Sequence, residues 1–343
     1  MYIPSWQLPD DGLQIQTLDA HTGGEPLRII TGGLPKIPGK NVLEKRRYFR
    51  EHLDYIRTAL MWEPRGHADM YGAVLTEPHS QEADFGVFFI HNEGYSTMCG
   101  HAVIALATAL LEVGILEKPG ENPEIRMDTP AGLVSATAFR KNGRVHKVAF
   151  RNVPSFVYAI DQTVEVPGIG RISYDIAYGG AFYVYCDAHA LGIDLTESHY
   201  GQLIDWGRRI KYAVREQVEI HHPFEEDLSF LYGTIFVGTA HDSNHHSRNV
   251  CIFANGEVDR SPTGTGVSGR IALHITRKEI DLYQSLTIES ILGSLMEVEA
   301  VERLNYGDYD AVIPRVSGSA HITGAHTFYI DPNDPLQKGF IFR

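Results

Sequence analysis

The sequence has little of what marks secreted, membrane-bound or redox-active proteins. Its three cysteines, Cys99, Cys186 and Cys251, are far apart and form none of the CxxC pairs that bind zinc or carry out redox chemistry. Residues 1–12 lack the basic and apolar parts of a signal peptide. The most apolar segment, residues 102–113, is too short to cross a bilayer. We therefore expect a reduced, cytoplasmic protein without a membrane partner.

Positive charge is also scarce. The formal net charge is −13 at pH 7, and no run of Lys and Arg reverses it locally, which argues against nucleic acid as a partner. Gly23-Gly24 and Gly32-Gly33 lie outside the GxxxxGK[ST] and GxGxxG patterns that hold nucleotides. We therefore expect no cofactor, and a small molecule as the ligand.

Histidines at residues 221–222 and 241–246 raise the alternative of a metal centre, because imidazoles gather in zinc sites. Their spacing matches no familiar ligand pattern, and the second segment is polar and loop-like. We interpret these histidines as solvated loop residues and predict no metal site.

The residues that are present predict a mostly β chain of about two domains, since 343 residues with 43% hydrophobic content exceed the usual size of one domain. Apolar and polar residues alternate in strand-like segments, and Asn142-Gly143 is the dipeptide that a tight type I′ hairpin needs. Helical patterns are fewer. They cover residues 46–61, 102–113, 198–215 and 266–277.

An internal repeat predicts two related halves. The sequences of residues 98–103 and 262–267 align without a gap. About thirty residues after each comes a second string, residues 128–133 and 289–294, and these two strings are also similar to each other. We place the boundary near Asp161. The expected domains are residues 1–160 and 161–320, with the segment from about 321 to 343 packing back on the first half.

The matching strings also carry the candidate chemistry. Cys99 precedes Gly100-His101 at the start of a predicted helix, where unpaired N–H groups and the helix dipole favour a thiolate. Gly264-Thr265-Gly266 opens the second helix in the same way and suits a substrate carboxylate. If the halves face each other, Cys99 and Thr263 lie on opposite sides of a ligand, with Cys99 as a base that works at neutral pH.

A purely structural explanation is the alternative to a functional role for each of these residue types. A free cysteine in an apolar strand is usually an inert core residue, which is our interpretation of Cys186 and Cys251. His101 could be a capping or surface histidine, but its place two residues after the base favours the site. Asp259 either caps a turn or belongs to the site, and local sequence does not choose between the two.

Residues 98–101 (MCGH) and 259–266 (DRSPTGTG) resemble the two signatures of the proline racemase family. The resemblance extends along nearly the whole chain. Further matching strings are residues 19–26, 179–182 and 247–249. Ala102 departs from the pattern, since family members usually carry glycine there.

The resemblance implies an α+β fold of two pseudo-symmetric halves, each a curved, mostly antiparallel sheet around a central helix, as in diaminopimelate epimerase. The active site would lie in the cleft between the halves, and the protein would form a homodimer. In the implied site, Cys99 accepts the α-proton and Thr263 faces the opposite side. The substrate contacts implied by the family are Gly100, His101, Asp259 for the ring ammonium, and Gly264 with Thr265 for the carboxylate.

Thr263 sets the implied activity, because racemases and epimerases of the family carry a second cysteine at that position. An alcohol has far too high a pKa to supply a proton as a thiol does. The Cys/Thr pairing resembles that of enzymes that dehydrate trans-3-hydroxy-L-proline to Δ1-pyrroline-2-carboxylate. We expect a cofactor-independent hydro-lyase, in which either His101 or Thr263 protonates the leaving hydroxyl.

Two rival functions stay open at this point. The chain could be a 4-hydroxyproline epimerase or proline racemase, if the Thr263 hydroxyl relays a proton from water. It could also be a non-catalytic protein that binds a cyclic amino acid, although the retained Cys99 favours an enzyme.

Overall fold

The computed structural model describes residues 6–342 and shows an α+β fold that is mostly β with few helices. The strands are β1 (Leu13–Thr22), β2 (Glu25–Gly32), β3 (Gly72–Thr76), β4 (Phe85–Ile90), β5 (Tyr95–Ser96), β6 (Glu124–Thr129), β7 (Gly132–Lys141), β8 (Arg144–Arg151), β9 (Ser155–Val166), β10 (Gly170–Tyr178), β11 (Phe182–Asp187), β12 (Leu231–Gly238), β13 (Ser247–Phe253), β14 (Glu257–Val258), β15 (Leu286–Glu289), β16 (Leu295–Tyr306), β17 (Tyr309–Gly318) and β18 (Ala320–Ile330). The α-helices are α1 (Val42–His52), α2 (Asp54–Met61), α3 (Gly100–Glu112), α4 (Ala188–Leu191), α5 (Tyr200–Gln217) and α6 (Gly264–Thr276).

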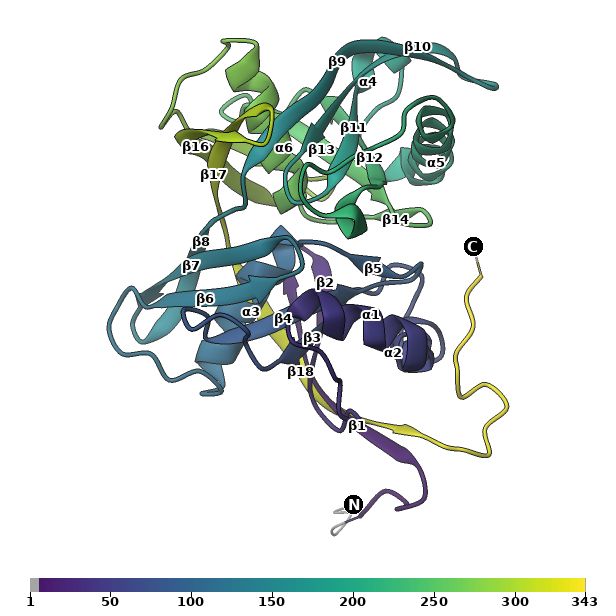
Figure 1. The fold of residues 1–343 in the computed structure, drawn as a ribbon. Helices are drawn as coiled ribbons and strands as arrows, with labels where there is room; N and C mark the ends of the chain where they lie inside the picture. Colours follow the sequence, from purple (N-terminus) through teal and green to yellow (C-terminus); the bar gives the residue numbers. More distant parts are fainter. Residues whose placement is uncertain (1–5, 343) are drawn as a thin grey trace.

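Figure 1 shows these elements in two groups, one above the other. The first lobe contains β1–β8, α1–α3 and β18, and the second lobe contains β9–β17 and α4–α6. The C-terminal strand β18 pairs antiparallel with β1, from Leu13↔Ile330 to Thr22↔Ala320. The two ends of the chain therefore lie in the same lobe.

Strand β17 connects the lobes by hydrogen bonds. It pairs with β16 and β9 in the second lobe and with β8 in the first, where Arg315↔Arg151 begins the register. The strands of both lobes thus belong to one hydrogen-bonded sheet system. This continuity fixes the lobes relative to each other along one side of the molecule.

Helices α3 and α6 are buried on nearly all sides, as their composition requires. Every residue of α3 from Gly100 to Leu111 is buried, and the helix packs against β1, β2, β7, β8, β17 and β18. A helix that is apolar all round has no face to offer to water. The corresponding helix α6 packs against β9, β10, β11, β16 and β17.

One buried charge in α6 has a specific partner. The Arg270 guanidinium donates a hydrogen bond of 2.8 Å to Asn249 Oδ1, and burial lowers its pKa to about 10. A buried charge is tolerated only when it is hydrogen-bonded. Asn249, from the string at 247–249, therefore helps to hold the helix that opens the second half of the site.

Several local predictions agree with the structure, and one is wrong. Asn142 and Gly143 have φ values of 54° and 79° and join β7 to β8 as a tight hairpin. The helix predicted over residues 46–61 instead begins at Val42 and breaks at Leu53, giving α1 and α2. Asn41 caps α1 through its side chain, and α2 begins at Asp54. Asp54 binds both Arg57 and Tyr95, and these contacts hold the second helix start.

The described part of the chain contains no candidate for a membrane-spanning helix. None of its helices combines the length and the apolar character that a bilayer crossing requires.

Candidate active site

The starts of α3 and α6 meet at two glycines. A Cβ atom placed on Gly100 would lie 2.5 Å from the Cα of Gly264, and one placed on Gly264 would lie 2.6 Å from the Cα of Gly100. Only a residue without a side chain permits backbones to come this close. The two helix N-termini, one from each lobe, therefore point their free N–H groups into the same region.

A small cavity lies at this meeting point and brings together all seven residues that the sequence predicted for the site. Its lining combines both signature strings with a set of aromatic residues. The lining residues are Tyr71, Met98, Cys99, Gly100, His101, Tyr183, Tyr232, Phe253, Asp259, Thr263, Gly264 and Thr265. Cys99 and Thr263 thus line the same small cavity, although they are 164 positions apart in the sequence.

Cys99 is the residue that precedes the first turn of α3. Its backbone is extended, with φ −146°, and its Sγ lies 3.0 Å from Nδ1 and 3.7 Å from Nε2 of His101. Burial raises the pKa of the Cys99 thiol well above its usual value, and the nearby Asp259 and Glu25 carboxylates raise it further. A hydrogen bond from the Ala102 N–H lowers it, but by less.

This outcome corrects the expectation that the helix end alone would lower the thiol pKa. The helix N-terminus does supply an N–H group to the sulfur, as predicted. Desolvation disfavours the thiolate more strongly than one N–H group favours it, because Cys99 is only 5% exposed. Burial therefore favours the protonated thiol of Cys99, which lies beside the His101 imidazole.

His101 lies inside the first turn of α3 with 3% of its surface exposed. Burial lowers its pKa to about 3, so the ring is neutral at physiological pH. The Thr22 hydroxyl donates a hydrogen bond of 2.8 Å to the His101 carbonyl and joins the string at 19–26 to the start of the helix.

Two consecutive turns build the loop that carries Asp259 to the start of α6. The Ser261 N–H donates to Asp259 Oδ1 at 2.8 Å, and the Thr263 N–H donates to Ser261 Oγ at 3.1 Å. Burial raises the pKa of Asp259 to about 6, against the opposing effect of the Ser261 hydrogen bonds. Asp259 is therefore both a turn residue and a residue of the cavity lining.

Thr263 precedes α6 in an unusual conformation. Its φ is 69°, a left-handed value that β-branched residues rarely adopt. Its hydroxyl is buried and has no hydrogen bond of ordinary geometry within residues 6–342. Backbone strain of this kind persists where the surrounding structure imposes it, and it concentrates at functional sites.

The first turn of α6 is held by tyrosines from a neighbouring strand. The hydroxyls of Tyr183 and Thr265 form a hydrogen bond of 2.7 Å, and the Tyr185 hydroxyl donates to the Gly266 carbonyl at 2.8 Å. Just before this strand, the Gly180 carbonyl accepts a hydrogen bond from the Thr97 hydroxyl. The string at 179–182 therefore links α6 to the segment that leads into Cys99.

Buried carboxylates also cross from the first lobe to the second. Glu25 Oε2 accepts a hydrogen bond of 2.7 Å from the Arg260 N–H, and Asp69 Oδ2 forms an ion pair of 2.7 Å with the Arg260 guanidinium. Glu257 Oε1 accepts a hydrogen bond of 2.8 Å from the Asn92 N–H. These contacts join the two lobes next to the loop that carries Asp259.

Sequence reasoning missed the aromatic part of the lining. Tyr71 precedes β3, Tyr232 lies in β12 and Phe253 ends β13. They come from three separate segments, and none stands in a motif. Only the tertiary pairing of the strands brings them to the cavity, so no local signal could have identified them.

The histidines considered for a metal site do not form one in the described chain, where no group of three or more His, Cys, Asp or Glu side chains converges to hold an ion. His245 instead lies 2.9 Å from Glu289, whose other oxygen pairs with Arg248 at 2.7 Å. The string at 247–249 therefore supports a buried ion pair.

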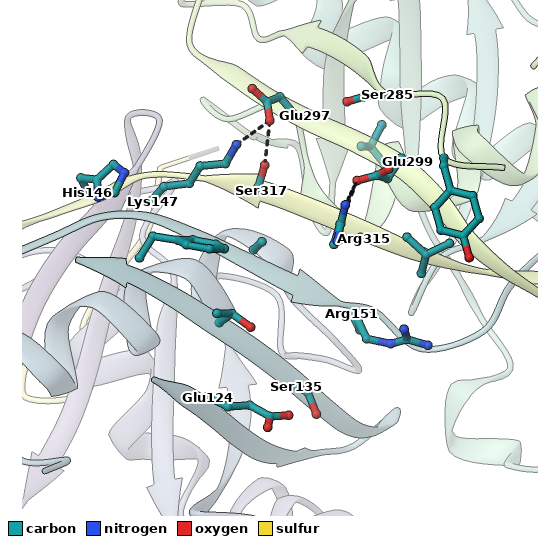
Figure 2. Close-up of a pocket in the computed structure, with 16 residues that line it drawn as sticks. Glu124, Ser135, His146, Lys147, Arg151, Ser285, Glu297, Glu299, Arg315 and Ser317 are labelled. Atoms are coloured by element: carbon teal, nitrogen blue, oxygen red, sulfur yellow. Dashed lines mark hydrogen bonds and ion pairs between the residues drawn. The ribbon is translucent and has the colours of Figure 1, made fainter. Parts of the chain in front are cut away.

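A wider groove lies across β7, β8, β16 and β17, away from the helix starts. Figure 2 shows that Lys147 and Ser317 contact Glu297 there, and that Arg315 pairs with Glu299. These charged groups satisfy one another at the surface, and none of the seven predicted site residues lines the groove. The cavity at the two helix starts is therefore the candidate active site.

Comparison with known proteins finds relatives along nearly the whole chain. The family described as "Proline racemase" matches residues 17–341. A trans-3-hydroxy-L-proline dehydratase of Colwellia psychrerythraea is 51% identical over 331 residues, covering 96% of this chain and 93% of the relative. The human protein of the same name is 46% identical over 335 residues, covering 96% and 95%.

A solved structure shares the fold. It is a hydroxyproline epimerase from Agrobacterium vitis with bound trans-4-OH-L-proline. Its TM-score is 0.92 at 30% sequence identity, with coverage of 96% of this chain and 95% of that chain.

Proposed function

Because this chain belongs to the proline racemase family, we propose that it catalyses the cofactor-independent dehydration of trans-3-hydroxy-L-proline to Δ1-pyrroline-2-carboxylate. One observation carries the proposal: the cavity between the two helix starts is lined by a single thiol, Cys99, and by the alcohol of Thr263 at the matching position before the other helix. The identity of about half the residues with dehydratases of this substrate supports it.

The substrate is held by groups of opposite character at its two ends. The free N–H groups at Gly264 and Thr265 bind the carboxylate, because a helix N-terminus favours an anion. The Asp259 carboxylate binds the ring ammonium. Gly100 and His101 contact the ring from the side of Cys99.

Binding of the ammonium also activates the base. Burial is the main cause of the raised thiol pKa, and the negative charge of Asp259 raises it further. A substrate cation beside Asp259 offsets the second contribution and so favours the thiolate of Cys99. The thiolate then removes the α-proton, while the N–H groups at both helix starts stabilise the negative charge that develops on the carboxylate.

Thr263 faces the opposite side of the ring and decides the outcome. Its hydroxyl has too high a pKa to deliver a proton to the carbanion, so inversion fails. The carbanion instead expels the hydroxyl from the neighbouring carbon and gives an enamine, which tautomerises to the product. This one-base arrangement favours loss of water over racemisation.

The proposal includes the architecture around the site. Two pseudo-symmetric halves have α3 and α6 as their central helices, with the boundary near Asp161 inside β9, and the described part of the segment after residue 320 packs on the first half. The matching environments of the two buried helices support this division. We place the protein in the cytoplasm as a homodimer, in accord with the family resemblance.

An epimerase of 4-hydroxyproline is the second candidate, because the Agrobacterium structure of the same fold binds that amino acid. The test is incubation of the purified protein in D2O with proline, trans-3-hydroxy-L-proline and trans-4-hydroxy-L-proline. Pyrroline product from the 3-hydroxy isomer alone supports dehydration. Inverted, deuterated amino acid without pyrroline rejects it, and binding without any turnover would identify a binding protein.

A further inference from the structure

The stereochemistry of the proposed substrate determines where its hydroxyl leaves, and the following inference rests on the proposed function. In a trans-3-hydroxy-L-proline ring the carboxylate and the hydroxyl are on opposite faces. The α-hydrogen is opposite the carboxylate on the same carbon, so it shares a face with the hydroxyl. A base that removes the α-hydrogen therefore lies on the side from which the hydroxyl departs.

This geometry excludes one of the two groups that the sequence suggested as proton donors. Thr263 faces the other side of the ring, away from both the α-hydrogen and the 3-hydroxyl. His101 lies on the correct side, but its ring is neutral with a pKa of about 3, and it already contacts the Cys99 sulfur at 3.0 Å. The Cys99 thiol formed by α-proton removal lies on that side too, and a further donor there would protonate the leaving oxygen and recover its own proton from this thiol.

Tyr71 is that donor by position. Its side chain lines the cavity, is 2% exposed and packs edge-on against His101 with a centroid distance of 4.8 Å. Its hydroxyl hydrogen-bonds the Ser96 hydroxyl and also faces Cys99, whose thiolate form it favours. Both Ser96 and Tyr71 belong to the lobe that carries Cys99.

The other cavity tyrosines are less well placed. Tyr183 forms a hydrogen bond with Thr265 and belongs to the side of α6. Tyr232 comes from the second lobe, and its ring packs against Phe253 and Tyr183. Its buried hydroxyl has no hydrogen-bond partner of ordinary geometry among residues 6–342, so nothing holds it towards Cys99 as Ser96 holds that of Tyr71.

We propose that Tyr71 is a catalytic residue that protonates the departing 3-hydroxyl on the same face from which Cys99 takes the α-proton. Cys99 accepts the α-proton and becomes a thiol. The C3–O bond then breaks, its electron pair stays on oxygen, and that oxygen takes the phenolic proton of Tyr71 and leaves as water. The thiol proton passes to the Tyr71 oxygen, which restores both residues and leaves the net loss of one water.

Burial raises the pKa of Tyr71 well above its usual value, so the phenol holds its proton at neutral pH and is available as a donor. The same burial disfavours a free phenolate. Return of the proton from Cys99 must therefore accompany the departure of the hydroxyl, and the short path between Tyr71 and Cys99 allows this.

The test compares Tyr71→Phe with the wild-type protein on two substrates, trans-3-hydroxy-L-proline and its analogue with chloride in place of the 3-hydroxyl. Chloride leaves without a proton. We expect Tyr71→Phe to lower kcat for the hydroxy substrate about 100-fold or more. Its kcat for the chloro analogue should stay within about threefold of wild type, because α-proton removal by Cys99 is intact.

Tyr183→Phe is the matched comparison, since it removes the same atom from the other side of the cavity. It should raise KM for both substrates to the same extent and leave the ratio of their kcat values unchanged. Ser96→Ala keeps the Tyr71 hydroxyl but removes its partner, and should lower only the turnover of the hydroxy substrate. This variant also serves if Tyr71→Phe fails to fold.

Two outcomes would overturn the role of Tyr71: equal losses on both substrates, which indicate a structural residue, or unchanged turnover of the hydroxy substrate. If the wild-type protein converted cis-3-hydroxy-L-proline as fast as the trans isomer, the shared-face geometry would also be contradicted. A wild-type protein that forms no pyrroline product at all would instead overturn the proposed function, so the two failures are distinguishable.

Discussion

Gly100 and Gly264 touch through their backbones at the point where α3 and α6 begin, with a Cβ on either one only 2.5 or 2.6 Å from the other's Cα. This contact sets the separation of the two helix ends. It therefore also sets the distance across the cavity between Cys99 and Thr263, which flank the two glycines in the sequence.

Alanine at either glycine should push the helix starts apart. We expect Gly100→Ala to lower the free energy of unfolding by about 1–3 kcal/mol, and kcat/KM by about 100-fold or more because the reacting groups move apart. Chemical denaturation and steady-state assays measure the two effects. Gly201→Ala is the control, because nothing lies within 4 Å of a Cβ at that position in α5. A fully active Gly100→Ala variant would contradict the importance of the contact.

Cys99→Ser should abolish α-proton removal, since an alcohol is a far weaker base than a thiolate at neutral pH. We expect a loss of about 10³-fold or more in dehydration, measured by formation of the pyrroline product. Cys186→Ala removes another buried thiol, outside the cavity, and should keep its activity. Equal activity of the two variants would show that the sulfur of Cys99 is not the base.

The pH profile should report Asp259. Its pKa is raised to about 6 by burial, and in the proposed function only its ionised form binds the substrate ammonium. kcat/KM should therefore rise as the pH increases through about 6, and any further rise at higher pH belongs to the Cys99 thiol, whose pKa is raised well above its usual value. Asp259→Asn should lower kcat/KM and remove this limb, whereas Glu25→Gln should retain it. An unchanged acid limb in Asp259→Asn would assign the titration to another group.

Glu289 should make stability depend on pH. Hydrogen bonds from the backbone N–H groups of Asp242 and His241, and from His245 and Arg248, outweigh burial and lower its pKa to about 2. A carboxylate with a depressed pKa stabilises the folded protein above its unfolded value near 4.3, and this contribution is lost as the pH falls towards 2.

Glu289→Gln should accordingly cost about 3 kcal/mol at pH 7, because it leaves buried Arg248 without its counter-charge. The difference from wild type should shrink as the pH falls below about 4. Chemical denaturation at several pH values measures it. A constant difference from pH 7 to pH 3 would contradict the assignment.

Local sequence signals were sufficient where one segment determines its own conformation. The Asn142-Gly143 hairpin follows from two residues that accept positive φ. The burial of α3 follows from its uniformly apolar composition. The signature strings located Cys99 and Thr263 at two helix starts, and the structure places both around one cavity.

Features that depend on distant segments could not be predicted. The break at Leu53 follows contacts of Asp54 with Tyr95, a residue from a separate strand. The sequence predicts a lowered pKa for the Cys99 thiol because it shows the helix N-terminus. It does not show the degree of burial or the neighbouring Glu25 carboxylate, which raise this pKa. Tyr71 reaches the cavity only through the assembled sheet.

The buried carboxylates that cross between the lobes have a consequence for how the lobes are held together. Glu25, Glu257 and Asp69 each bind a main-chain amide or a guanidinium of the opposite lobe. Pulling the lobes apart at this point would leave each buried acid without that partner, which costs free energy until water replaces it. Polar contacts therefore join the lobes here, in addition to the strand pairing of β17.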